Sequence, residues 1–405
     1  MKNYSLKFLL ILSLFFSCKK KKEDVRPEVV PVEVAPSGPY LVSITKVRTQ
    51  TMGAISLIIR NFAPTLVPLL PEMNYDVDTY KIRYKTTYKG NATIASGIIC
   101  VPRTDTVLFP TLSFQHGTLF DVAEVPSNSF IQQVQISALA SAGYFSLSPD
   151  YLGFDSVTRF MHPYYIAQYS ANAVRDMLLA SEEFSKMKNI KLNKQLFLAG
   201  YSQGGNVTMA AMKSIESKPV GNFELTASAA GAGGYNLNGI FKTITARDSF
   251  PSPNYIAYIV QSFRISNDWN TPLSYYFKEP FASRIPNLIN GTTSANTINA
   301  NLSERLDTLL QQNFIASVKN GTDLQFSNAL SVNSLYDWKP NTPLRLYHGD
   351  QDEVVPFSDS DSTYRHMLNL GATSVSFVPL PNQDHSSGAL PMVSDVLVWF
   401  NSLVK

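Results

Sequence analysis

A four-residue apolar run, Leu196 to Ala199, leads without a break into the sequence Gly200-Tyr201-Ser202-Gln203-Gly204-Gly205. The apolar run predicts a short buried strand, and residues 206–216 predict a helix. A strand that turns this sharply into a helix needs small residues around the turn, and the GxSxG pattern supplies them. This feature constrains the fold most strongly, because it places Ser202 in a strained turn at the end of a strand.

Short apolar strands and helices alternate along most of the chain. The patterns predict helices at 52–62, 130–142, 360–368 and 393–403, and a long helix from Pro163 to Met187. They predict strands at 80–87, 93–101, 110–114, 144–148, 196–199, 225–230, 344–347 and 374–378. Strands that alternate with helices favour a mostly parallel sheet covered on both faces, and the leading hairpin adds an antiparallel edge. The predicted fold class is therefore α/β.

The alternation stops between Tyr235 and Trp338, a stretch crowded with Tyr, Phe, Asn, Ser and Pro. We expect this stretch to form a cap over the edge of the sheet that carries Ser202. The predicted domains are a core made of residues 40–234 and 339–405, and a cap inserted at residues 235–338.

The first 17 residues combine two lysines with the apolar run Phe8 to Phe16 and end just before Cys18. The run is shorter than the roughly 20 apolar residues that cross a bilayer, so it predicts a cleaved signal peptide. A small residue followed by cysteine resembles the lipobox of bacterial lipoproteins. This resemblance implies lipidation of Cys18 and export to a bacterial membrane, at the periplasmic or surface face. Residues 18–39 are rich in lysine and proline and predict an extended tether.

Hydrophobic residues make up 44% of the 405-residue chain and charged residues 16%, which is typical of a folded protein. Loss of the signal peptide removes Lys2 and Lys7, so the formal net charge falls from +3 to +1 (3 − 2) and gives no reason to expect nucleic acid as a partner. The apolar neighbours of Cys100 indicate a buried small side chain. The sequence contains no metal-ligand cluster and no phosphate-binding glycine loop, so we expect chemistry without a metal or cofactor.

A serine hydroxyl is a poor nucleophile at neutral pH and needs an imidazole base that a carboxylate orients. His385 follows the last predicted strand and is the candidate base, whereas Asp352 follows the preceding strand and is the candidate acid. Asp350, two residues earlier in the same loop, is the alternative acid. The chain order Ser202, Asp352, His385 matches the order serine, acid, histidine of one known class of hydrolases.

The other histidines have structural interpretations. His348 ends a strand, His366 lies within a predicted helix, and His162 precedes a proline, so we expect packing or surface roles for all three.

Acyl transfer also needs two hydrogen-bond donors for the oxyanion. The first expected donor is the N–H of Gln203, directly after the serine and at a helix N-terminus. The second should come from the turn Gln115-His116-Gly117-Thr118, which follows the third strand. By resemblance to enzymes with an HGx loop, Thr118 is the expected donor and Gly117 the alternative, and His116 braces the loop.

These features together resemble the α/β-hydrolases over most of residues 78–405, apart from the cap. The sequences PDYLGF, His162-Pro163-Tyr164 and GYSQGG resemble the secretory lipase-like group and its lipid-anchored bacterial relatives. The resemblance implies hydrolysis of carboxylic esters, including acylglycerols in the yeast members of that group. It also implies a substrate pocket shaped by His116, Asp150, Tyr151 and Tyr201.

Two other functions are compatible with the same residues. A serine peptidase of this fold would use the same acyl-enzyme, but such enzymes often carry propeller repeats or an acidic cap, and neither occurs here. A surface binding protein could keep the fold without the chemistry. The sequence leaves open the substrate, which could be a small-molecule, glycan or lipid ester, and the oligomeric state.

Overall fold

The computed structural model describes residues 32–34 and 38–405. The predicted signal peptide, Cys18 and most of the predicted tether lie outside the described residues. Within them, none of the helices combines the length and the apolar character that crossing a bilayer requires.

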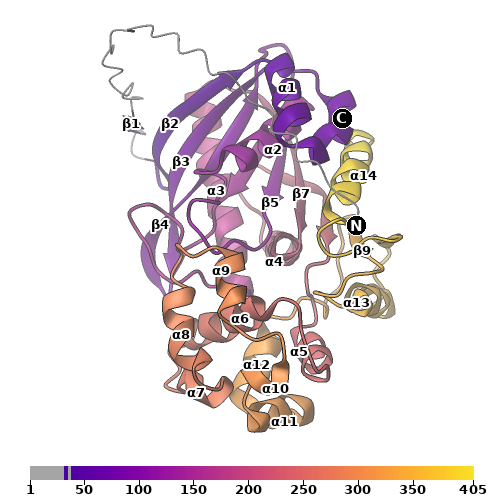
Figure 1. Ribbon diagram of the computed structural model, residues 1–405. Coiled ribbons are helices and arrows are strands. Elements are labelled where there is room, and N and C mark those ends of the chain that lie inside the picture. The colour runs from indigo at the N-terminus through magenta and orange to yellow at the C-terminus, as the bar shows by residue number, and fades with distance from the viewer. Residues whose placement is uncertain (1–31, 35–37) are drawn as a thin grey trace, which may run out of the picture.

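One mixed sheet runs through the described residues (Figure 1). Its ten strands follow the order β1-β2-β3-β4-β6-β5-β7-β8-β9-β10. The pairs from β1 to β4, and the pair of β4 with β6, are antiparallel, whereas the run from β6 to β10 is parallel. The strands are β1 Val32–Val34, β2 Leu41–Gln50, β3 Val77–Tyr88, β4 Asn91–Pro102, β5 Phe109–Gln115, β6 Phe145–Pro149, β7 Leu192–Tyr201, β8 Glu224–Gly231, β9 Leu344–Gly349 and β10 Val375–Leu380.

Helices cover both faces of the sheet because alternate side chains of each strand point to opposite sides. In β7, Leu196 and Leu198 belong to one apolar core, and Phe197 and Ala199 belong to the other. Helices α3, α4 and α13 contribute to the first core, and α1, η1, α2 and α14 to the second. Their bounds are α1 Met52–Phe62, the 3₁₀ helix η1 Pro64–Glu72, α2 Phe130–Ser141, α3 Ala167–Met187, α4 Gln203–Ser217, α13 Phe357–Asn369 and α14 Ala389–Asn401.

The predicted fold class is confirmed: the sheet is mostly parallel, has helices on both faces and carries an antiparallel edge. The predicted start of the long helix at Pro163 is wrong, because α3 begins at Ala167. Tyr165 has a positive φ of 57°, and Ile166 is extended, so this stretch turns before the helix starts. The helix expected at 206–216 begins earlier, at Gln203, immediately after the serine.

Residues 235–338 fold into eight helices that lie together at one end of the sheet (Figure 1). These helices have an apolar cluster of their own, in which the Phe326 ring packs edge-on against those of Phe241 and Phe314. The cluster also includes Tyr164 and Tyr165, so the helices pack on loops of the core. The helices are α5 Leu237–Thr245, α6 Pro253–Ser266, α7 Leu273–Tyr276, α8 Phe281–Leu288, α9 Ala295–Ala300, α10 Leu306–Leu309, α11 Gln312–Asn320 and α12 Leu324–Val332.

Cys100 lies in β4 and is completely buried, as its apolar neighbours predict. Its Sγ atom lies 3.6 Å from the hydroxyl oxygens of Thr79 and Ser137. Burial raises the pKa of this thiol to about 11, so it is protonated at neutral pH and packs as a small apolar side chain.

Candidate active site

The three loops that carry the predicted triad leave the sheet at one edge. Ser202 follows β7, Asp352 lies in the loop after β9, and His385 lies in the loop after β10. The strands from β7 to β10 are parallel, so their carboxyl ends share this edge. The sheet thereby brings Ser202 and His385 together across 183 positions of sequence.

Ser202 occupies a strained turn between β7 and α4. Its backbone angles are φ 58° and ψ −126°, a combination that non-glycine residues rarely adopt. The turn is held by the Ser202 N–H, which donates to the Gly231 carbonyl at 2.9 Å, and by the N–H groups of Gly205 and Asn206, which donate to the Ser202 carbonyl. The strained conformation expected at this position is therefore present.

The glycines of the turn are required because other backbone segments approach them closely. A Cβ atom on Gly204 would overlap the Gln115 carbonyl oxygen, and one on Gly200 would overlap the carbonyl of Gly204. The start of α4 therefore crosses the end of β5 in direct backbone contact. This close crossing brings the turn after β5 near Ser202.

His385 bridges the serine and the aspartate. Its Nε2 atom lies 2.8 Å from Ser202 Oγ, and its Nδ1 atom lies 2.7 Å from Asp352 Oδ2. The other carboxylate oxygen, Oδ1, accepts the backbone N–H groups of Val354 at 2.9 Å and Val355 at 2.8 Å. The Asp352 side chain is completely buried, and these donors fix its orientation.

A second histidine, His348, contacts the same carboxylate. Its Nε2 atom lies 3.2 Å from Asp352 Oδ2 and 3.0 Å from the Val355 carbonyl oxygen, and its Nδ1 atom lies 2.7 Å from Ser360 Oγ. Burial alone would raise the pKa of Asp352, but the hydrogen bonds from His348 and His385 outweigh it and hold that pKa well below its usual range. Asp352 is therefore a carboxylate at neutral pH.

The contact between His348 and Asp352 was not predicted from the sequence, although their spacing of four residues in HGDQD was visible. Asp350, the alternative acid, is exposed, and its Oδ1 atom accepts the Asn382 N–H at 2.8 Å. It braces the loop after β10 and makes no hydrogen bond to His385 among the contacts of the described residues.

Gln203 is the first residue of α4, where helix geometry leaves the N–H without an intrahelical acceptor. Its side-chain Nε2 lies 2.7 Å from Nε2 of His162, and His162 Nδ1 lies 2.8 Å from the Leu152 carbonyl oxygen. Burial lowers the pKa of His162 to about 3, so the ring is neutral; it donates from Nδ1 to the carbonyl and accepts at Nε2 from the Gln203 amide. His162 is thus a packing residue, as expected, and it also fixes Gln203.

The turn after β5 lies against the serine. A Cβ atom placed on Gly117 would be 3.8 Å from Ser202 Cβ, and Gly117 lines the cavity beside the serine. The Thr118 hydroxyl lies 2.8 Å from the Tyr164 hydroxyl, which anchors the turn to the loop before α3. The turn that carries Thr118 and Gly117, the two predicted candidates for the second oxyanion donor, therefore lies close to Ser202.

His116 braces this turn: its Nδ1 atom lies 2.7 Å from the Gly117 carbonyl oxygen, and its ring stacks on Tyr151 with centroids 4.1 Å apart. Burial lowers the pKa of His116 to about 4, so the ring is neutral at physiological pH. The Tyr151 hydroxyl donates to the His116 carbonyl at 2.8 Å.

The predicted pocket roles of Asp150 and Tyr151 are corrected by their positions. Both are buried, and neither lines the two cavities that border Ser202. Asp150 accepts hydrogen bonds from the Ser96 hydroxyl at 2.5 Å and the Ser127 N–H at 2.8 Å, so its side chain ties the loop before α2 to strand β4. The other two predicted pocket residues, His116 and Tyr201, do line the cavity beside the serine.

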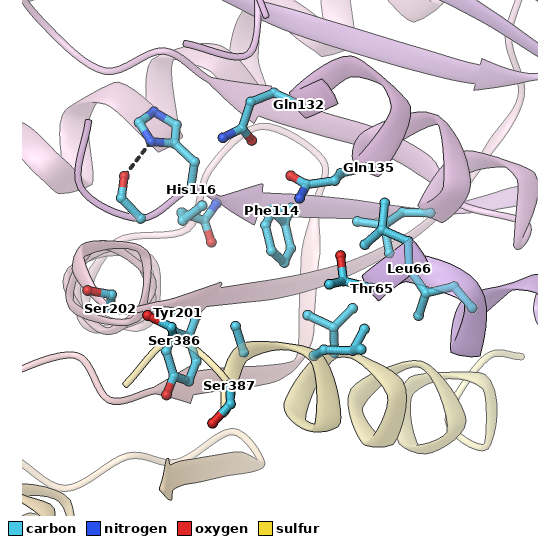
Figure 2. A pocket seen from close by; sticks show the side chains of 17 residues that line it. Thr65, Leu66, Phe114, His116, Gln132, Gln135, Tyr201, Ser202, Ser386 and Ser387 are labelled. Atoms are coloured by element: carbon cyan, nitrogen blue, oxygen red, sulfur yellow. Dashed lines mark hydrogen bonds between the residues drawn. The ribbon is translucent and has the colours of Figure 1, made fainter. Parts of the chain in front are cut away.

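Two cavities meet at Ser202. The larger has a volume of about 520 Å³ and lies between β5, α2 and α14, with η1 at the end far from the serine (Figure 2). The smaller has a volume of about 50 Å³ and is lined largely by residues of helices α5 and α6. Within residues 32–34 and 38–405, no group of three or more His, Cys, Asp or Glu side chains is placed to hold a metal ion.

The family model described as secretory lipase matches residues 127–403 of this chain. Among curated proteins, the chain is similar to Lipase 9 of Candida albicans, with 22% identity over 293 residues. That match covers 72% of this chain and 62% of the yeast protein, so the chain spans less than two thirds of the relative's length.

Solved structures show the same fold. A Legionella pneumophila protein, named provisionally as a hydrolase, has a TM-score of 0.83 and 26% identity over 90% of this chain and 98% of its own. A ligand-bound structure of the rice cell wall degrading esterase LipA from Xanthomonas oryzae has a TM-score of 0.80 and 22% identity, over 91% of this chain and 99% of its own.

The close crossing at Gly204 makes a prediction about stability. Gly204→Ala should lower the free energy of unfolding by about 3 kcal/mol, because the added methyl group overlaps a backbone carbonyl that cannot move aside. Urea unfolding measures the change. Gly53→Ala is the matched control, since a methyl group there meets open space in helix α1 and should leave the stability unchanged or raise it by about 0.5 kcal/mol. Equal unfolding midpoints for the two variants would show that the backbone at Gly204 has room for a methyl group, against the close crossing of α4 and β5.

Proposed function

Because this chain belongs to the secretory lipase family, we propose that it hydrolyses carboxylic esters through an acyl-enzyme on Ser202. The observation that carries the proposal is the position of His385, with one ring nitrogen 2.8 Å from Ser202 Oγ and the other 2.7 Å from Asp352 Oδ2. An imidazole in this position accepts the serine proton as the hydroxyl attacks, and the buried carboxylate stabilises the imidazolium that forms.

The reaction proceeds in two halves. Ser202 Oγ bonds to the ester carbonyl carbon while its proton moves to Nε2 of His385, and the bond to the alcohol oxygen then breaks as His385 returns that proton to the leaving alcohol. In the second half, a water molecule gives a proton to His385 and its hydroxyl to the acyl carbon. The carboxylic acid leaves, and Ser202 regains its proton.

The oxyanion of each tetrahedral intermediate needs donors that are already in place. We assign the first to the Gln203 N–H, whose residue is held by the hydrogen bond between its side chain and His162. The second comes from the turn after β5, with Thr118 as the first candidate and Gly117 as the alternative. The closeness of Gly117 to the serine, where an added Cβ atom would lie 3.8 Å from Ser202 Cβ, supports this turn as the source.

Asp352 is the proposed acid of the triad, and its four donors support that choice over Asp350. The Asp352 carboxylate accepts hydrogen bonds from two histidine rings and two backbone N–H groups. Asp350 is exposed and accepts a hydrogen bond from the loop after β10. We propose residues 235–338 as the cap of the enzyme, since these helices form the roof of the smaller cavity. The family match to lipases gives no support to the peptidase or the binding-protein alternative.

The name of the family indicates export, and the N-terminal sequence supports a more specific proposal. We propose that residues 1–17 are a signal peptide and that the lipidated Cys18 anchors the enzyme to a bacterial membrane. The part of the predicted tether before β1, residues 18–31, would then hold the catalytic core away from the lipid surface, because Val32–Val34 form β1 and pair with β2 in the sheet.

Ser202→Ala should lower turnover of short p-nitrophenyl esters by on the order of 10⁴-fold or more, because it removes the hydroxyl that lies 2.8 Å from Nε2 of His385. A fluorophosphonate probe should label the wild-type chain at Ser202 and leave the variant unlabelled. Unchanged thermal unfolding of the variant serves as the folding control. Wild-type turnover in the Ser202→Ala variant would remove the basis of the proposed function.

Asp352→Asn should lower kcat by about 10⁴-fold, because an amide cannot stabilise the imidazolium of His385. Asp350→Asn is the matched control in the same loop and should keep most of the wild-type kcat, since its carboxylate contacts only loop groups. Steady-state kinetics on one ester compares the two variants. The reverse order of effects would make Asp350 the acid.

Cys18→Ala should move the protein from the membrane fraction to the soluble fraction of the cells that export it, because the acylated residue is lost. Metabolic labelling with a palmitate analogue should mark the wild-type protein and not the variant. Membrane association and labelling that survive the substitution would exclude Cys18 as the anchor.

A further inference from the structure

Ser202 lies between two cavities that differ tenfold in volume, at about 520 Å³ and about 50 Å³. A serine esterase has to place two parts of its substrate on either side of the attacked carbonyl: the acyl group and the alcohol. The question is which part belongs in which cavity. The roles of the two cavities rest on the proposed function and specify its substrate.

The larger cavity is lined by both apolar and polar side chains (Figure 2). Leu66, Phe114 and Leu139 are among the apolar ones, and Gln132 and Gln135 of α2 add amide groups. Ser386 and Ser387 line the opposite wall and are exposed, so this cavity reaches the surface of the molecule. It therefore suits a large group with an apolar body and polar substituents.

The smaller cavity is lined mostly by apolar side chains of the cap, including Ile240 and Ile256. A volume of about 50 Å³ holds only a few water-sized groups. Its walls are tightly fixed, since the Tyr164 ring stacks on Tyr258 with centroids 4.3 Å apart and the Tyr165 hydroxyl donates to the Gly233 carbonyl at 2.9 Å. Expansion for a long chain would require these packed rings to separate.

The proton transfer from His385 determines which cavity holds the alcohol and which holds the acyl group. The alcohol oxygen has to receive its proton from Nε2 of His385, so the alcohol leaves on the side of that histidine. Ser386 and Ser387, the two residues directly after His385, line the larger cavity. The alcohol must also depart before water attacks the acyl-enzyme, and the larger cavity gives it a route to solvent.

We propose that this enzyme acts on short-chain acyl esters of large alcohols, with the alcohol in the cavity between α2 and α14 and the acyl group in the small cavity under the cap. The acyl groups accepted best run from acetyl to butanoyl. The alcohol carries a ring-sized apolar body with polar substituents. This is the reverse of an enzyme that selects long fatty acyl chains.

Two ester series on the full chain test the proposal. With p-nitrophenol as the constant alcohol, kcat/KM should fall at least tenfold between butanoate and decanoate. With acetate as the constant acyl group, kcat/KM should rise at least tenfold from ethyl to cyclohexylmethyl acetate, whose alcohols have similar acidity. A preference for decanoate over butanoate, or for ethyl over cyclohexylmethyl acetate, would overturn the assignment.

Two substitutions separate the cavities. Gln135→Trp narrows the larger cavity at a half-buried position and should lower the ratio of kcat/KM for cyclohexylmethyl over ethyl acetate at least tenfold, without moving the acyl-length optimum. Ile240→Ala enlarges the smaller cavity and should extend the acyl optimum by one or two carbons, without changing that ratio. Val332→Trp, at an 80% exposed position on α12, is the control and should change neither.

Deacylation provides an independent measurement, because the acyl-enzyme no longer carries the alcohol. The deacylation rate of the acetyl-enzyme, from pre-steady-state bursts, should be the same in Gln135→Trp and the wild type. If Gln135→Trp alters the acyl profile and Ile240→Ala alters the alcohol ratio, the two cavities have the opposite roles. Turnover retained by the Ser202→Ala variant would contradict the proposed function itself, and this result is independent of the cavity assignment.

Discussion

The strained backbone of Ser202 is the constraint on which the rest of the site depends. At a φ of 58° the backbone of Ser202 leaves the extended conformation of β7. Only a tightly packed surrounding structure can hold a non-glycine residue in this strained conformation. That packing is the close crossing of Gly200 and Gly204 with the end of β5, which leaves no room for a side chain. The same crossing brings the turn after β5 against the serine. One steric requirement therefore positions the proposed nucleophile and a candidate oxyanion loop together.

The electrostatics of the site follow from a second constraint, the burial of Asp352. A buried carboxylate is costly unless hydrogen bonds replace its lost water. Here His385, His348 and the N–H groups of Val354 and Val355 supply donors to both oxygens. These donors keep the group ionised and aim one oxygen at His385 Nδ1. His348 in turn is held by Ser360 of α13, so the orientation of the acid depends on the packing of that helix.

Sequence patterns predicted those parts of the fold that depend on interactions between residues close together in the chain. Apolar runs at alternating spacing gave the strands, and the GxSxG turn between a strand and a helix indicated the bend at Ser202. The start of α3 was mispredicted because a proline is tolerated in the first helical turn, and nothing in the sequence revealed the positive φ of Tyr165. Asp150 was placed in the pocket by the resemblance of PDYLGF to the lipase-like group, yet its partners, Ser96 of β4 and Ser127 of the loop before α2, tie it into the scaffold. Contacts of that kind form only when distant segments meet.

The cavities beside Ser202 are also formed by segments that are distant in the sequence, so their sizes could not be predicted from local patterns. The loss of alternation after Tyr235 predicted a cap, and a cap suggests that the substrate binds beneath it. The structure has its larger cavity on the other side of Ser202, with η1 as its far end. A nine-residue 3₁₀ helix with two internal prolines has no helical or strand periodicity, so it could not be predicted from the pattern of residues. The family model matches residues 127–403, and η1 at 64–72 precedes that region. The far end of the proposed alcohol cavity therefore lies outside what the family model describes, whereas its walls on α2 and α14 lie within that region.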